Sequence, residues 1–172
     1  MGGKLFVLLK NGICYNPELI GKKDILMVKN SIYKIEDNID DKAFCDIMTV
    51  DCSDKIICPG FIDQHIHIIG GGGEGGPASR IPEIMLSEIV SAGITTVVGV
   101  LGFDSITRSL KGLLAKARAL EEEGLNTFIY TGSYEVPTPT ITGSVMSDVS
   151  LIDKVVGVGE IAISDHRSSH PS

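Results

Sequence analysis

The first third of the chain alternates short apolar runs with turn-forming residues. Between residues 4 and 58, five runs rich in leucine, isoleucine and valine are separated by turn signals such as Asn-Gly and Asn-Pro; they read KLFVLLK, DILMVKN, SIYKIED, DIMTVDC and KIIC. Short runs of this kind between turn residues are typical of strands in an antiparallel sheet. The pattern therefore predicts a small β-sandwich-like domain over residues 1–58.

After Pro59 the pattern changes to extended apolar runs that alternate with helical ones. It predicts strands over 60–68, 93–102, 125–133 and 156–164, and helices over 81–93, 106–123 and 147–154. Strands that alternate with helices are typical of βα units around a parallel sheet. The runs are almost wholly apolar, as in strands that are covered on both faces of a sheet. We therefore expect an α/β domain over residues 59–172.

The helix over 106–123 has the clearest periodicity. Its apolar residues recur at helical spacing, and Gly124 supplies the residue that ends it; they are Ile106, Leu110, Leu113, Leu114, Ala117 and Leu120. Pro82 and Glu83 suit the first turn of the preceding helix. Beyond the fourth strand the sequence has no helix to cover it. Because open sheet edges are costly, we expect an incomplete chain.

Composition and charge narrow the class of protein. The chain has 172 residues, 43% of them hydrophobic, and a formal net charge of −7, which indicates a globular protein and disfavours a nucleic-acid partner. We expect a cytoplasmic protein without a membrane partner, since neither a signal peptide nor an apolar segment of about 20 residues is visible. The four cysteines have no metal-binding or redox spacing, so reduced thiols are expected at Cys14, Cys45, Cys52 and Cys58.

The stretch PGFIDQHIHIIGGGGEGG, residues 59–76, holds the first candidate chemistry. On a strand, Asp63, His65 and His67 point to one face, so that the two imidazoles can reach the same ion. Imidazole nitrogen binds Zn²⁺ well, and other divalent transition metals fit similar sites. The alternative is a chance pair on a polar surface. The apolar strand favours metal binding, because two histidines buried without polar partners would be costly.

The glycine run 70–73 has three open interpretations. It is a flexible tether, a nest for an anion, or backbone that approaches a ligand closely and delivers Glu74 beyond it. A nucleotide-binding P-loop is excluded, because no Lys followed by Ser or Thr comes after the glycines. Glu74 is otherwise a solvated side chain, and it gains a role only where a cationic ligand group lies near it.

The same residues carry a family resemblance. PGFIDQHIH resembles the first-strand motif of the amidohydrolase superfamily, and the continuation is similar to the isoaspartyl (β-aspartyl) dipeptidases, from about Lys4 to the last residue; the matching segments are HIIGGGGEGGPASRIPE, VVGVLGFDSITR, LLAKARALEEEG, TGSYEVPTPTITGSV and AISDHRSS. The resemblance implies that residues 59–172 form the first half of a metal-bearing (β/α)₈ TIM barrel, incomplete at its C-terminus. It further implies a homo-oligomeric metallopeptidase that hydrolyses small β-aspartyl dipeptides with a metal-activated water.

The resemblance also implies substrate contacts. Glu74, with the backbone near Gly72, would hold the free α-ammonium of the dipeptide. Tyr134 would polarise the scissile carbonyl and support the oxyanion, and Arg167 would grip the α-carboxylate of the aspartyl moiety. These roles suit the chemistry of a zwitterionic substrate, which needs a carboxylate, a guanidinium and a donor for developing charge. Without the resemblance, Tyr134 could as well be an aromatic residue at the rim of the sheet, and Arg167 would be a partner in a surface ion pair.

The implied metal site departs from the family at one ligand. His65 and His67 would bind the more buried ion of a binuclear Zn²⁺ site. Many relatives carry a carbamylated lysine on the fourth strand, where this sequence has Glu160. A glutamate already carries a carboxylate, although it is shorter, so we predict that Glu160 bridges both ions. The alternative, an unpaired glutamate on an apolar strand without metal, is opposed by desolvation.

A second departure concerns the ligands and the base that the family places after the fourth strand. They are absent here, and His166 and His170 are not substitutes for them, so we expect this chain alone to be inactive. Two alternatives to the dipeptidase remain. One is a cyclic-amide amidohydrolase of the dihydroorotase or hydantoinase kind, which Glu74 disfavours because a ring amide has no free ammonium. The other is a non-catalytic truncated fragment.

Overall fold

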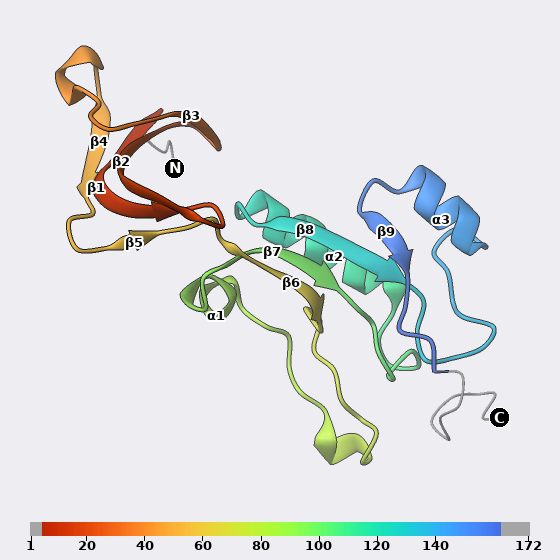
Figure 1. Ribbon diagram of the computed structural model, residues 1–172. Helices are drawn as coiled ribbons and strands as arrows, with labels where there is room; N and C mark the ends of the chain where they lie inside the picture. Colours follow the sequence, from red (N-terminus) through yellow and green to blue (C-terminus); the bar gives the residue numbers. More distant parts are fainter. Residues whose placement is uncertain (1–4, 163–172) are drawn as a thin grey trace. The chain divides into compact units, whose positions relative to one another are not determined.

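The computed structural model describes residues 5–162 and divides the chain into two compact units, Met1–Pro59 and Gly60–Ser172. Figure 1 shows a sheet in each unit and the helices α1, α2 and α3 in the second. No helix in the described part of the chain is both long enough and apolar enough to span a membrane.

The first unit is built on one five-stranded sheet. Its strands are β1 (Phe6–Tyr15), β2 (Leu19–Val28), β3 (Ser31–Glu36), β4 (Ile47–Asp51) and β5 (Ile56–Ile57), with the short 3-10 helix η1 (Asp41–Ala43) before β4. The order is β3-β2-β1-β4, and β5 also pairs with β1. Strands β4 and β5 run parallel to β1, so the expectation of a wholly antiparallel sheet is wrong. The described strands of this unit form a single sheet, and the sandwich-like arrangement stays a prediction.

A buried carboxylate organises the interior of the first unit. Asp24 accepts hydrogen bonds from the backbone amides of Asn11 at 2.8 Å and Ile39 at 2.9 Å, and it pairs with Lys10 at 3.4 Å. Burial opposes ionisation of Asp24, but these donors outweigh it and hold the pKa of the carboxyl below its ordinary value. The carboxylate therefore fastens the segment after β3 to β1.

The second unit contains a four-stranded parallel sheet in the order β6-β7-β8-β9. The strands are β6 (Phe61–Ile66), β7 (Ile94–Gly99), β8 (Asn126–Thr131) and β9 (Val155–Val158). The helical segments are η2 (Pro77–Ser79), α1 (Leu86–Ser91), α2 (Leu110–Glu122) and α3 (Val145–Leu151). Alternation of strand and helix, as predicted, gives an α/β fold. A closed barrel stays an expectation.

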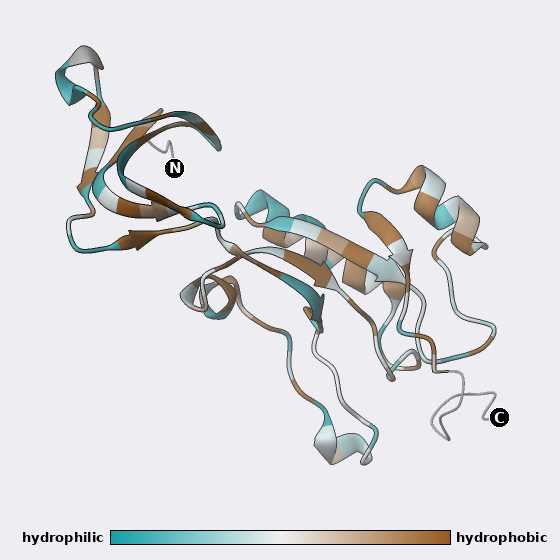
Figure 2. Cartoon of the chain, in the orientation of Figure 1, coloured by the Kyte–Doolittle hydropathy of each residue, from teal (hydrophilic) through white to brown (hydrophobic). Residues whose placement is uncertain are grey.

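Helix α2 confirms the predicted apolar face. Ser109 caps its start by accepting a hydrogen bond from the amide of Gly112 at 3.1 Å. The residues that face the sheet are buried, and they pack with Val97 and Ile129 of the strands; they are Leu110, Leu113, Ala117 and Leu120. Ile106 lies outside the helix and is 90% exposed, so its assignment to this face is wrong. Figure 2 shows hydrophobic residues along the sheet and on α2.

Helix α1 begins later than predicted. It starts at Leu86, and the side chain of Glu88 accepts a hydrogen bond from the amide of Met85 at 2.8 Å. Pro82 and Glu83 therefore lie in the preceding loop and not in the first turn. The amide of Ile81 donates to the carbonyl of Gly71 at 2.9 Å, which ties that loop to the glycine run.

The edge strands of the second sheet differ from its centre. In β6, Phe61 and Ile62 are 62% and 63% exposed, and in β9 Val156 is 49% exposed, whereas Val97 in β7 is fully buried. Among the described residues, the expectation of strands covered on both faces therefore holds for the central strands β7 and β8 and not for the edge strands β6 and β9. Apolar side chains at the two edges remain open to solvent.

Candidate metal centre

Two histidines and a glutamate converge at the carboxyl ends of β6 and β9. One donor atom from each of His65, His67 and Glu160 lies within 4.8 Å of the others. Nε2 of His65 is 3.0 Å from Oε1 of Glu160, and Nε2 of His67 is 3.7 Å from Oε2. The structure therefore brings together the three predicted metal ligands, while metal binding itself stays a prediction.

The strand ends that hold these donors are shorter than predicted. Strand β6 ends at Ile66 and β9 at Val158, so His67 and Glu160 both lie in the segments that follow the strands. The pairing of β6 with β7 shifts between Asp63 and Ile66. Asp63 accepts a hydrogen bond from the amide of His65 at 3.0 Å, and its carboxylate is not part of the donor cluster. Asp63 therefore bonds to the backbone of the strand, and the prediction that it shares a face with the histidines stays a prediction.

Two atoms of the cluster lack a hydrogen-bond partner. Nδ1 of His67 and Oε2 of Glu160 are buried and unbonded within the described part of the chain. Unpaired buried polar atoms are costly, and a carboxylate oxygen beside two imidazoles is a suitable ligand for a divalent transition metal. The side chain of His65 is 58% exposed, so the cluster is open to solvent on one side. These residues fit a metal ion.

The glycine run lies folded against the segment that precedes α1. Gly72 has φ +75°, and a Cβ atom there would lie 2.3 Å from the carbonyl oxygen of Ser79. The hydroxyl of Ser79 accepts hydrogen bonds from the amides of Gly73 at 3.2 Å and Gly75 at 3.1 Å. Only glycine permits so close an approach. The run is thus a tight backbone turn, and the tether interpretation is wrong.

An arginine binds both ends of the loop that contains the glycine run. We call this loop, residues 69–81, the glycine loop. Nε of Arg108 donates to the carbonyl of Ile69 at 2.9 Å, and Nη2 donates to the carbonyl of Ile81 at 2.8 Å. Its Nη1 pairs with Asp104 at 2.9 Å. Burial opposes ionisation of Asp104, but hydrogen bonds from Thr107 and the nearby arginines outweigh it and lower the pKa of the carboxyl. The motif analysis missed this clamp, whose visible signal is an Asp and an Arg four residues apart.

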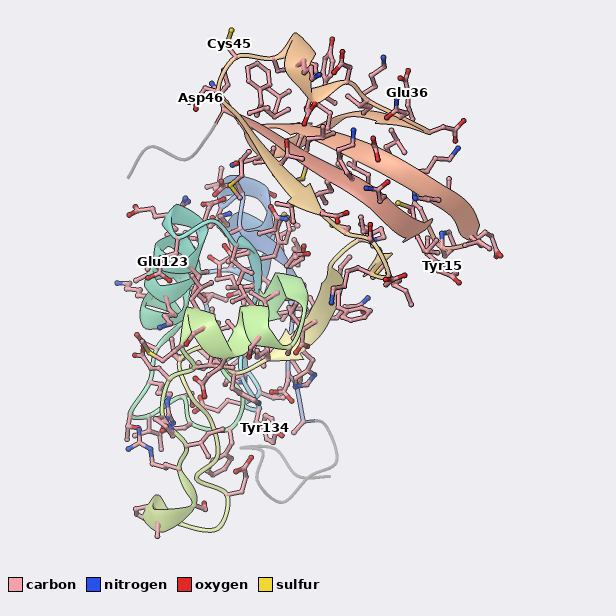
Figure 3. The ribbon with its side chains drawn as sticks, turned by 90° about the vertical axis from the view of Figure 1, so that its left-hand side faces the viewer. Tyr15, Glu36, Cys45, Asp46, Glu123 and Tyr134 are labelled. Carbon is pink, nitrogen blue, oxygen red and sulfur yellow. The ribbon has the colours of Figure 1, made fainter. Side chains whose placement is uncertain are left out.

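The predicted substrate residues are spread over several loops. Glu74 is exposed in a turn of the segment between β6 and α1, and it makes no hydrogen bond or ion pair with a described residue. Figure 1 shows this segment as a long loop. Tyr134 is half-buried in the loop after β8 (Figure 3), and its ring meets Phe103 edge to face, with centroids 6.1 Å apart. Its carbonyl accepts from the amide of Ala162 at 3.4 Å, which connects it to the Glu160 segment. Arg167 lies outside the described residues.

A cavity of about 440 Å³ lies beside the histidines. It is lined by His65, Ile66 and His67 from the end of β6, and on the other side by residues 81–84 and Glu88. Tyr134 and Glu160 do not line it. This cavity therefore does not unite the donor cluster with the predicted substrate residues.

Comparison with known proteins finds similarity to a β-aspartyl dipeptidase and to dihydroorotases. It is 51% identical to the β-aspartyl dipeptidase of Fervidobacterium islandicum, solved in complex with β-Asp-Leu, with a TM-score of 0.93 over 100% of this chain and 45% of that one. It is 44% identical over 63 residues to the dihydroorotase of Sulfurihydrogenibium sp., a match of 36% of this chain and 14% of that protein. No family model matches.

A more distant match concerns the fold alone. The D-hydantoinase of a Thermus species is 20% identical, with a TM-score of 0.53 over 75% of this chain and 28% of that one. This chain thus spans less than half the length of the dipeptidase that it resembles at 51% identity.

Proposed function

From the resemblance to the isoaspartyl dipeptidases of the amidohydrolase superfamily, which the solved dipeptidase confirms, we propose that this chain is part of a metal-dependent hydrolase of β-aspartyl dipeptides. The observation that carries the proposal is the convergence of His65, His67 and Glu160 at one end of the sheet. Glu160 stands where many relatives have a carbamylated lysine. The resemblance implies a carboxylate ligand at this position, and the distances of 3.0 and 3.7 Å from the carboxylate oxygens of Glu160 to Nε2 of His65 and Nε2 of His67 support that role.

The donor set supports zinc as the resident ion. Two imidazoles and a carboxylate are good ligands for Zn²⁺, and no cysteine is part of the cluster. The carboxylate of Glu160 lies near both histidines, 3.0 Å from Nε2 of His65 and 3.7 Å from Nε2 of His67, which supports a carboxylate that shares an ion with them; its bridge to a second ion rests on the family resemblance. A bound divalent ion would polarise the scissile carbonyl and make water a stronger nucleophile at neutral pH.

The remaining roles follow from the charges of a β-aspartyl dipeptide. We assign its ammonium to Glu74, its α-carboxylate to Arg167 and the developing charge on the carbonyl oxygen to the hydroxyl of Tyr134. Packing supports a common site for two of them. Gly73, next to Glu74, lies beside the ring of Phe103, which in turn meets the ring of Tyr134.

Proton transfer requires a group that the described residues do not place at the site. Among them, Glu160 is the carboxylate in the donor cluster, and a bridging ligand does not serve as a base. We therefore propose that residues 1–172 by themselves do not turn over substrate. Loss of a general base lowers a rate by about two to four orders of magnitude.

Local similarity to dihydroorotase supports a second candidate function, hydrolysis of a cyclic amide. The test compares substrates on the complete protein that contains this sequence, loaded with Zn²⁺. We expect release of leucine from β-Asp-Leu, with α-Asp-Leu, dihydroorotate and hydantoin as comparison substrates. Turnover of a ring amide without cleavage of β-Asp-Leu would favour the second candidate and reject the first.

A further inference from the structure

The turn that follows β7 contacts two parts of the candidate site that are far apart in sequence. Val100 and Leu101 are buried at 0% and 1% exposure, and the amide of Val100 donates to the carbonyl of Ile66 at 3.0 Å. The next two residues, the buried Gly102 and the half-buried Phe103, contact the donor cluster and the ring of Tyr134, respectively. Each of them faces a different half of the site.

Gly102 lies directly against the buried donors. Its φ is +72°, and a Cβ atom there would lie 2.4 Å from Cε1 of His67, 3.0 Å from Nδ1 of His67 and 3.2 Å from Oε2 of Glu160. These are the same two polar atoms that are buried without a hydrogen-bond partner. Any side chain at this position would displace the imidazole or the carboxylate.

Phe103 faces the substrate side. Its ring meets that of Tyr134 at an interplanar angle of 81°, a favourable edge-to-face arrangement. A Cβ atom at Gly73 would lie 3.6 Å from Cδ1 of Phe103, so the ring also adjoins the glycine loop that carries Glu74. In addition, the amide of Tyr134 donates to the carbonyl of Gly102 at 3.4 Å.

The turn is fastened on its far side as well. Asp104 is 8% exposed and is held by Arg108 at 2.9 Å and by the amide of Thr107 at 2.9 Å. Arg108 in turn binds both ends of the glycine loop. The turn is therefore bonded to neighbouring segments on both sides, through Val100 before it and through Asp104 after it.

We propose that Gly102 and Phe103 form a positioning turn, in which Gly102 sets the geometry of the metal ligands and Phe103 sets that of Tyr134 relative to the glycine loop. The inference rests on the proposed function, which assigns the roles of metal ligand to His67 and Glu160 and of oxyanion donor to Tyr134. Neither residue reacts with substrate. Each acts through the side chains that it contacts.

The test measures the effects of Gly102 and of Phe103 separately, in the complete protein. Zinc affinity is measured by competition with a chelator, and the environment of Tyr134 by ¹⁹F NMR of protein labelled with 3-fluorotyrosine, the signal being assigned with Tyr134→Phe. For Gly102→Ala we expect zinc to bind about 10- to 100-fold more weakly, as when a group that orients metal ligands is changed. For Phe103→Ala we expect a shifted Tyr134 signal with zinc affinity within about twofold of wild type.

Matched variants control for backbone strain and for loss of an aromatic ring. Gly143 has φ +106° with nothing near its missing Cβ, so Gly143→Ala introduces a similar strain away from the site. Phe128→Ala removes a half-buried ring next to Lys154. If Gly102→Ala does not fold, Gly102→Asn keeps the left-handed backbone and still introduces the Cβ atom.

Kinetics complete the test. In Phe103→Ala we expect kcat for β-Asp-Leu to fall by about 100-fold, since a displaced catalytic group loses that much, and Phe103→Tyr to restore most of it. Unchanged zinc affinity in both Gly102 variants, or an unmoved Tyr134 signal in Phe103→Ala, would overturn the positioning turn. A wild-type protein that cleaves no β-Asp-Leu, while both variants show the expected zinc and NMR changes, would overturn the proposed function and support the turn.

Discussion

Nε2 of His65 lies 3.0 Å from Oε1 of Glu160, although His65 belongs to one edge strand of a four-stranded sheet and Glu160 follows the other. In a flat sheet, β6 and β9 would be about 14 Å apart, because neighbouring strands are separated by about 4.8 Å. Curvature of the sheet brings such strand ends together, and the segment after β9 that carries Glu160 also shortens the distance. Closure of a sheet into a barrel needs curvature of this kind.

Substitution of Glu160 by Gln tests the metal site. The amide keeps the shape but loses the charge that attracts a cation, so we expect zinc affinity to fall by at least about tenfold and the zinc content per chain to decrease. Zinc is measured by elemental analysis after dialysis. Glu122→Gln, an exposed glutamate at the end of α2, is the matched control and should bind zinc like wild type. Wild-type zinc content in Glu160→Gln would remove Glu160 from the ligands.

Tyr134→Phe tests the assigned oxyanion donor. The hydroxyl is needed chiefly when charge develops on the carbonyl oxygen, so we expect kcat for β-Asp-Leu to fall by about 100- to 1000-fold with a small change in KM. Tyr130→Phe removes a hydroxyl from the preceding strand and should leave kcat near wild type. If KM rises and kcat does not change, Tyr134 binds substrate without stabilising the transition state.

Asp148 in α3 should make the stability of the second unit depend on pH. It is fully buried and accepts hydrogen bonds from Thr131 and Thr142 hydroxyls at 2.5 and 2.6 Å, and from the amide of Ile141 at 2.8 Å. Burial opposes ionisation, but these donors outweigh it and lower the pKa of the carboxyl. A lowered folded-state pKa adds stability above the ordinary value of about 3.9, and this stability is lost as pH falls through the folded-state value.

Comparison of Asp148→Asn with wild type measures that contribution. At pH 7 we expect the free energy of unfolding to decrease by about 3 kcal/mol, because buried donors lose their charged acceptor. The difference should shrink as pH falls below about 4, because the carboxyl of the unfolded chain then binds a proton and the folded one, whose pKa is lower, does so only at still lower pH. Urea unfolding followed by circular dichroism gives both values. Asp153→Asn breaks an exposed ion pair with Arg118 and should change stability by less than about 1 kcal/mol at any pH.

Arg108→Ala tests the clamp on the glycine loop. Without the guanidinium, the carbonyls of Ile69 and Ile81 lose their donors, and the amide of Ile81 should exchange its hydrogen faster in hydrogen-exchange NMR. An increase of about tenfold corresponds to about 1.4 kcal/mol of lost local stability. Arg118→Ala is the control, since Arg118 is bonded to Asp153 far from this loop in sequence. Equal exchange of Ile81 in wild type and Arg108→Ala would show that the loop does not depend on the clamp.

The elements and the candidate ligands follow from local properties of the sequence. The apolar spacing of α2 places Leu113 and Ala117 on one face whatever the helix packs against, because the period of a helix is fixed by its backbone. Likewise, the two histidines of the HxH pair were visible as donors on an apolar strand, whereas Glu160 was named as a ligand from the resemblance to the amidohydrolase superfamily. Their types and order in the chain needed no coordinates.

Tertiary structure alone decided where those groups meet. The strands end at Ile66 and Val158 because pairing with neighbours stops there, and this puts His67 and Glu160 in the following segments and leaves Asp63 out of the cluster. The close approach of Gly102 to His67 joins parts of the chain that have no common period or motif. A sequence pattern reports only contacts within one helix or strand, whereas these distances are set by the curl of the sheet and the packing of its loops.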